Sequence, residues 1–139
     1  MTIQNLPIGV QSFENIRNCN YLYVDKTKYI VQLLKGRVYF LSRPRRFGKS
    51  LFLSTLAAYF RGQKELFKGL YLEKAEDELA QQENREAWQK YPVLYIDLNI
   101  RNYKDEEALL NRLDLILSEW ETEYNLDRIS DAPEERFAY

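Results

Sequence analysis

The stretch that decides the fold is LSRPRRFGKSL, residues 41–51. A phosphate-binding loop runs from a glycine through four residues to Gly-Lys-Ser or Gly-Lys-Thr, and this stretch has the second half of that pattern. Arg43 stands where the first glycine belongs, and Pro44 follows it with no N–H to offer. The stretch is therefore a nucleotide site, a basic patch for another phosphate, or a solvated turn.

The segments on both sides of this loop favour the nucleotide site. Residues 38–41 form a short β-branched and aromatic run that predicts a buried strand. An apolar helix is predicted to begin at Lys49 and to end at Gly62, buried against a sheet. Amides at a helix N-terminus point at a bound anion, and Gly48 lets the backbone approach it. Lys49 can then reach the terminal phosphates, and the Ser50 hydroxyl can bind Mg²⁺.

The loop also concentrates positive charge. Four of its side chains are cations and none is acidic, although the whole chain has a net charge of -1. The missing first glycine affects the entry turn, whereas the phosphate-contacting amides are expected later, at positions 46–50. The sequence therefore predicts a nucleotide site. Its candidate residues are Arg43, Pro44, Arg45, Arg46, Phe47, Gly48, Lys49, Ser50 and Leu51.

The rest of the chain predicts an α/β fold. Further helices are expected over 25–35, with Asp25 as the N-cap, over 75–90 and over 103–124, and a second buried strand over 93–98. Alternating strands and helices indicate a parallel sheet with flanking helices. Two strands are too few for a stable sheet, so we expect a partial P-loop NTPase fold that lacks its later strands or takes strands from elsewhere.

Composition excludes several kinds of chemistry. The 139 residues include no histidine and one cysteine, Cys19, which removes Ser-His-Asp, Cys-His and histidine-metal sites and any internal disulfide. Hydrophobic residues make up 45% of the chain and charged residues 29%, as in one globular domain. Because neither a signal-peptide pattern nor an apolar run of ~20 residues is present, a cytoplasmic location without membrane contact is expected.

At RPRRFGKSL the chain resembles a family, the bacterial AAA-ATPase-like proteins, whose ATPase-like region precedes a PD-(D/E)XK nuclease-like domain. The resemblance extends over most of residues 8–125, through YVDKTKYI, SLFLSTLAAYF, LFKGL and KYPVLYIDLN. In this family RPRRFGKS replaces the usual glycine-rich start. The resemblance implies a P-loop fold, ATP as ligand, and the lysine and magnesium-hydroxyl roles for Lys49 and Ser50. Residues 1–139 would then be the N-terminal portion of one ATPase-like domain, with the nuclease-like domain absent.

Hydrolysis needs a second motif, an apolar strand that ends in an aspartate for Mg²⁺ and is usually followed by an acid that polarises water. Asp97 ends the predicted strand 93–98, but Leu98 comes next. The acidic pairs at 77–78 and 105–106 lie in polar helical segments. Ser50 and Asp97 are therefore the candidate Mg²⁺ ligands, no catalytic residue is assigned, and hydrolysis is expected to be weak or absent.

Two other functions compete with ATP binding. Arg43, Arg45 and Arg46 could contact a nucleic-acid backbone, which needs cations but no magnesium. Alternatively, the chain is a non-catalytic interaction fragment whose helix 103–124 docks a partner. The missing C-terminal portion or a nuclease-like domain is a candidate partner of the chain. Asp25, predicted as an N-cap, could also act near the nucleotide.

Overall fold

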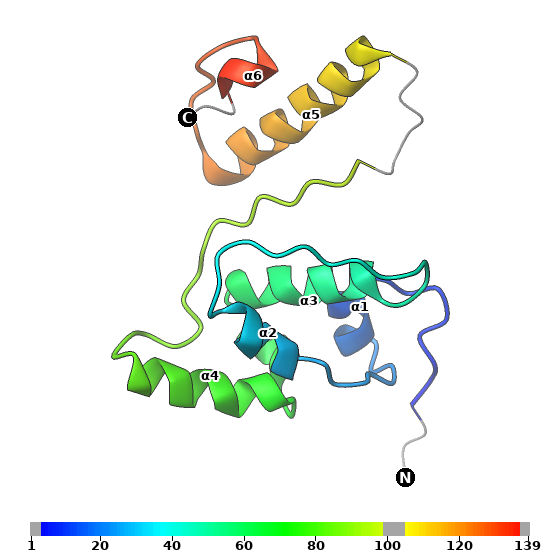
Figure 1. The fold of residues 1–139 in the computed structure, drawn as a ribbon, viewed down its shortest axis with the longest axis vertical. Helices are drawn as coiled ribbons and strands as arrows, with labels where there is room; N and C mark the ends of the chain where they lie inside the picture. Colours follow the sequence, from blue (N-terminus) through cyan, green and yellow to red (C-terminus); the bar gives the residue numbers. More distant parts are fainter. Residues whose placement is uncertain (1–3, 99–104, 137–139) are drawn as a thin grey trace. The chain divides into compact units, whose positions relative to one another are not determined.

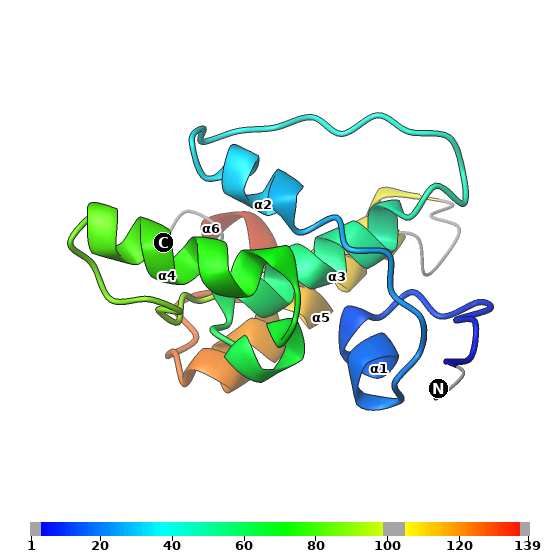
Figure 2. The same ribbon diagram turned by 90° about the horizontal axis from the view of Figure 1, so that it is seen from below.

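A computed structural model describes residues 4–98 and 105–136, which contain helices and no strand. The chain divides into two compact units, Met1–Val93 and Leu94–Tyr139. The first unit contains α1 (Phe13–Asn18), α2 (Lys28–Leu33), α3 (Lys49–Phe60), the 3-10 helix η1 (Lys64–Phe67) and α4 (Tyr71–Gln82). The second contains α5 (Glu106–Tyr124) and α6 (Pro133–Arg136). Figures 1 and 2 show these elements from two directions.

The predicted α/β fold is therefore wrong for the described residues. The run 38–41 is extended and unpaired, and Val38 and Phe40 are 90% and 94% exposed. Residues 37–43 make no backbone–backbone hydrogen bond, and in Figures 1 and 2 their segment passes from α2 back to α3 beside no strand. Residues 93–98 also form no strand. A β-branched run suits a strand, but a strand exists only when a second segment pairs with it.

Aromatic packing forms the core of the first unit. Phe67 lies between two rings, with centroids 4.9 Å from Phe13 and 5.2 Å from Trp88, and Tyr59 packs edge-on against Trp88 at 5.9 Å. These contacts join α1, α3, η1 and the segment after α4. The core consists of Phe13, Ile30, Ala58, Tyr59, Leu66, Phe67, Leu72 and Trp88.

Helix α4 begins earlier than the sequence predicts because a distant segment caps it. The carboxylate of Asp25 accepts hydrogen bonds from the Thr27 amide (2.9 Å), the Thr27 hydroxyl (2.7 Å) and the Tyr71 amide (2.7 Å). The Thr27 hydroxyl oxygen in turn accepts from the buried Leu72 amide at 3.1 Å. These bonds satisfy two N-terminal amides of α4, so the helix runs over 71–82 instead of 75–90.

The buried carboxylate of Glu76 connects α4 with two other segments. It is 1% exposed and accepts hydrogen bonds from the Tyr59 hydroxyl (2.8 Å), from both terminal nitrogens of Arg85 (2.6 and 3.0 Å) and from the Trp88 amide (3.2 Å). Burial opposes the ionisation of Glu76, but these bonds outweigh it and lower the pKa of the carboxyl group below its usual value. Burial of the Tyr59 hydroxyl and its hydrogen bond to Glu76 raise the pKa of Tyr59.

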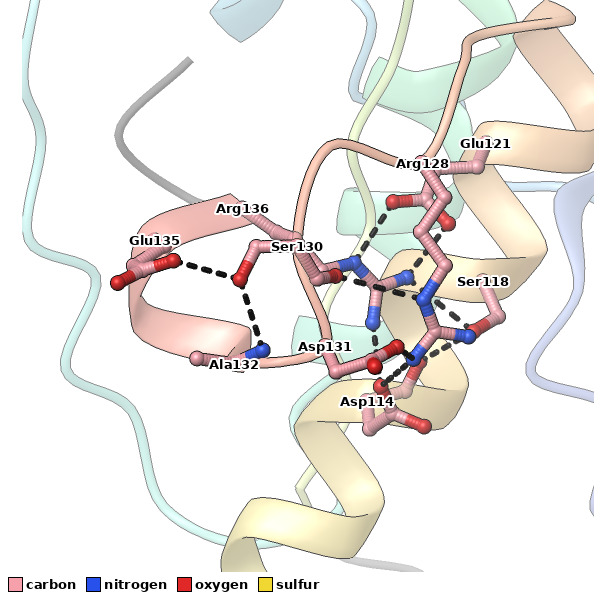
Figure 3. A network of polar contacts seen from close by, with 9 residues as sticks. All are labelled: Asp114, Ser118, Glu121, Arg128, Ser130, Asp131, Ala132, Glu135 and Arg136. Carbon is pink, nitrogen blue, oxygen red and sulfur yellow. Dashed lines mark hydrogen bonds and ion pairs between the residues drawn. The ribbon is translucent and has the colours of Figure 1, made fainter.

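The second unit is held together by arginine (Figure 3). The Arg136 guanidinium, on α6, donates to both carboxylate oxygens of Glu121 (2.7 and 2.5 Å), to the Ser118 hydroxyl (3.2 Å) and to the carboxylate of Asp114, all on α5. Arg128 reaches the same Asp114 carboxylate at 3.2 Å. On its apolar side α5 buries Ile116, Leu117 and Trp120.

We predict that Glu76 makes the first unit acid-sensitive. Its pKa is lower in the folded chain than in the unfolded one, so its stabilisation is present above pH 4.5, the ordinary value, and is lost as the pH falls through the folded value. Glu76→Gln should cost about 2 kcal/mol at neutral pH and nothing once the pH is below the folded pKa of Glu76. Urea unfolding followed by Trp88 fluorescence, in a Trp120→Phe background, measures this difference.

The matched control is Glu83→Gln, because Glu83 is the other acidic partner of Arg85 but its side chain is 57% exposed. That change should cost no more than about 1 kcal/mol. Equal costs for the two variants at neutral pH would contradict the assignment of the acid sensitivity to Glu76.

Candidate functional site

The beginning of α3 is an open helix N-terminus. Gly48 is its N-cap, in the left-handed region at φ 77° and ψ 22°, and Lys49 and Ser50 are the first two helical residues. The first hydrogen bond of the helix runs from the Phe52 amide to the Gly48 carbonyl at 2.9 Å, and no side chain caps the helix. Within the described structure the amides of Lys49, Ser50 and Leu51 have no acceptor. The predicted start of this helix is confirmed, and its N–H groups are available to an anion.

The cations of the loop are exposed. Arg43, Arg45, Arg46 and Lys49 form no ion pair with the described part of the chain. The first turn of α3 contains no acidic residue either. Because neither an internal carboxylate nor a cap neutralises this end of α3, its charges and its dipole act together on any anion that approaches.

The backbone of the loop departs from the most favourable conformations. Arg46 has a φ of 64°, in the left-handed region that an L-residue enters at a cost of about 1–2 kcal/mol. Gly48 adopts the same region without that penalty, and a Cβ built on it would meet no atom within 4 Å. Strained backbone of this kind concentrates at binding and catalytic sites.

A cavity of about 740 Å³ adjoins the beginning of α3. Apolar side chains of α2 and α3 line it, together with residues of the intervening segment, and Gly48 and Lys49 belong to its lining. Its other charged residues are Lys26, Arg37 and Arg43, and no acidic residue lines it. The sequence pattern did not reveal this cavity, because the apolar residues around it were assigned to a buried strand and to a helix covered by a sheet.

Asp25 does not act as the predicted N-cap of α2. The helix begins at Lys28 with Thr27 as N-cap, and Asp25 holds the start of α4 instead. Burial disfavours its charge, but the bonds from Thr27 and Tyr71 outweigh this and lower the pKa of Asp25. Its two carboxylate oxygens are occupied by these structural bonds. Lys26, between Asp25 and Thr27, lines the cavity.

The candidate Mg²⁺ ligands lie in different units, because Ser50 belongs to the first unit and Asp97 to the second. Among the described residues, no three carboxylate, cysteine or histidine side chains form a group that could hold a metal ion. The Ser50 hydroxyl, exposed in the first turn of α3, still suits Mg²⁺, which usually takes one or two protein ligands and completes its shell with phosphates and water.

The other acidic pairs have structural positions. Asp77, on α4, accepts hydrogen bonds from the Trp88 indole (3.3 Å) and from Lys64 (3.5 Å). Asp105 is the N-cap of α5 and accepts from the Ala108 amide at 2.8 Å. Within residues 4–98 and 105–136 no strand precedes either pair. In the described residues no helix is long and apolar enough to cross a bilayer.

Comparison with known proteins identifies relatives of the sequence. The family model described as "Predicted AAA-ATPase" matches residues 7–139. A protein of Azotobacter chroococcum mcd 1, described as "Uncharacterized protein in vnfD 5'region", is 45% identical over 119 residues, which cover 81% of this chain and 21% of that protein. The chain thus spans about a fifth of the length of this relative. No solved structure matches the present chain.

We predict that Gly48→Ala lowers the free energy of unfolding of the first unit by about 1 kcal/mol, because the new side chain has space but must enter the left-handed region. Gly69→Ala, at φ 80° with equally open surroundings, should cost the same. Gly62→Ala should cost more, since its Cβ would lie 2.7 Å from the Trp88 carbonyl oxygen. Urea unfolding followed by Trp88 fluorescence compares the three, and a Gly48 cost that matches Gly62 would contradict the open geometry.

Proposed function

Because the chain belongs to the predicted AAA-ATPase family, we propose that residues 43–51 bind the phosphates of a nucleoside triphosphate, ATP, together with Mg²⁺. The observation that carries the proposal is the uncapped start of α3 directly after Gly48, with Lys49 and Ser50 in its first turn. Free amides, a helix dipole and a lysine at one place suit the multiple negative charges of a triphosphate.

Most residues of the loop have a physical role in this proposal. The amides of Lys49, Ser50 and Leu51 donate to phosphate oxygens, and the Lys49 ammonium neutralises the terminal phosphates. The Ser50 hydroxyl is a ligand for Mg²⁺, which supplies charge neutralisation between the phosphates when it is bound. The exposed arginines at positions 43, 45 and 46 add positive charge around the same anion.

The arginine cluster also supports a second candidate function, contact with a nucleic-acid backbone. Four exposed cations without acidic partners suit a row of phosphates as well as a triphosphate. The two functions differ in their dependence on conditions. Backbone binding falls steeply with salt and ignores Mg²⁺, whereas triphosphate binding depends on Lys49 and on Mg²⁺.

The relative from Azotobacter chroococcum is much longer than this chain, since the matched residues cover 21% of it. We infer that residues 1–139 act as the nucleotide-binding portion of a larger ATPase, with further parts supplied by sequence outside this chain. A PD-(D/E)XK nuclease-like domain is the partner that the family resemblance implies. In this arrangement the cytoplasm is the expected location.

Lys49→Ala is expected to abolish the binding of Mg·ATP, measured by isothermal titration calorimetry on the 139-residue chain. Lys74→Ala is the matched control, because Lys74 is an exposed lysine on α4 that lines no part of the cavity. Ser50→Ala should weaken binding mainly when Mg²⁺ is present. If Lys49→Ala binds Mg·ATP as tightly as the parent chain, the phosphate site lies elsewhere.

The chain alone should bind ATP far better than it hydrolyses it. Hydrolysis requires a group that orients water, and no carboxylate lines the cavity beside the loop. The cations can neutralise charge but cannot accept a proton. A phosphate-release assay with Lys49→Ala as the blank checks this. Turnover near the ~1–100 per second of ordinary phosphoryl-transfer enzymes would mean that an acid of this chain completes the site.

A further inference from the structure

The cavity beside the loop has the properties of a small-molecule site. Its volume of about 740 Å³ lies within the roughly 300–1,000 Å³ of ligand pockets, which are mostly apolar with a few polar groups. Aliphatic side chains of α2 and α3 line it, and its charged lining residues are all cations. The aromatic residues of its lining are Tyr29, Tyr39, Phe40, Phe47, Phe52 and Phe60.

The cavity and the phosphate loop share residues. Gly48 and Lys49 line the cavity, and they also begin α3, where the free amides lie. One ligand could therefore place an anionic group on the loop and an apolar, planar group in the cavity. We propose that the cavity holds the base of the nucleoside triphosphate whose phosphates bind residues 43–51, an inference that rests on the proposed function.

Three features favour a heteroaromatic base over an aliphatic ligand. Aromatic side chains offer faces for stacking, which is worth roughly 1–3 kcal/mol per base. The Gln32 carboxamide, which lines the cavity and has no hydrogen-bond partner in the described structure, can both donate to and accept from a base edge. No carboxylate lines the cavity, so no charge of the lining repels the phosphates of the same ligand.

The side of the cavity formed by residues 36–41 is held in place. The Tyr39 hydroxyl donates to the Gln32 carbonyl oxygen at 3.4 Å, which ties this segment to α2. The Tyr39 phenol also lies against Gly36 so closely that a Cβ at this glycine would collide with it. The tyrosine therefore keeps its position only beside a glycine, and the segment that bridges α2 and α3 in Figure 2 is anchored at this point.

The first test compares Mg·ATP with magnesium tripolyphosphate, which has the phosphates but no base, by calorimetry on the 139-residue chain. The inference predicts that ATP binds at least about tenfold more tightly, the gain expected from stacking one base. Equal affinities would overturn the base site and leave the phosphate site intact. If neither ligand binds, the proposed function itself fails, so the two failures are distinguishable.

The second test locates the base. Leu53→Trp fills the cavity from α3, and Leu53 stands outside the core cluster. The variant should lose the tenfold preference for ATP and keep its affinity for tripolyphosphate. Leu115→Trp, at an exposed leucine of α5, is the control and should change neither affinity. A Leu53→Trp chain that keeps the full preference for ATP would place the base outside the cavity.

A measurement on the parent chain keeps the inference testable if Leu53→Trp does not fold. In methyl-labelled protein with Mg·ATP bound, nuclear Overhauser effects should connect the base protons with the methyl groups of Leu53 and Leu56, which both line the cavity. If the base protons instead show nuclear Overhauser effects to leucines that do not line the cavity, the base does not lie in the cavity, whatever the variants show.

Discussion

The buried carboxylate of Glu76 is the interaction on which the first unit depends. It lies on α4 and joins Tyr59 of α3 to Arg85 and to the backbone of Trp88. Trp88 has a φ of 57°, a conformation that a bulky residue enters only at a cost, and the hydrogen bond from its amide to Glu76 helps to hold it. With Trp88 fixed, its indole closes the core against Phe67 and Tyr59.

This arrangement determines which faces of α3 remain available. Ala58 and Tyr59 pack one face of the helix against the core. Thr55 is also buried on α3, and its hydroxyl donates a hydrogen bond to the Leu51 carbonyl oxygen at 2.8 Å. Leu53 and Leu56 are then directed to the cavity. The helix therefore has a packed side that fixes its axis and an open side that adjoins the loop. A rigid helix holds its N-terminal amides in constant directions, as the binding of a fixed anion requires.

The sequence predicted the features that depend on neighbouring residues. The start of α3 at Lys49 and the end of α5 at Tyr124 follow from local patterns and are confirmed. Helix α1 was missed, although Ser12 accepts from the Asn15 amide in an ordinary N-cap that the sequence could have indicated. The short α6 was also missed, and its attachment through Arg136 to acids 15 and 22 residues away leaves no local signal.

The failures came from contacts between distant segments. The beginning of α4 depends on Asp25 and Thr27, which lie more than forty residues earlier in the chain. The two predicted strands had suitable composition, but pairing is a property of two segments, and residues 37–43 find no such partner. The cavity was hidden for the same reason, because its walls come from α2, α3 and the segment between them.

The wrong fold class leaves the physical basis of the proposed phosphate site unchanged. An anion site at a helix N-terminus is built from a left-handed residue, the first free amides of the helix and the side chains beside them. All three are local here, in Gly48, in the amides of residues 49–51 and in the side chains of Lys49 and Ser50. The segment that precedes the loop has to deliver the chain to Gly48, and an extended segment does this whether or not it is paired. The proposed phosphate site therefore rests on the helix that the motif begins and does not require a sheet.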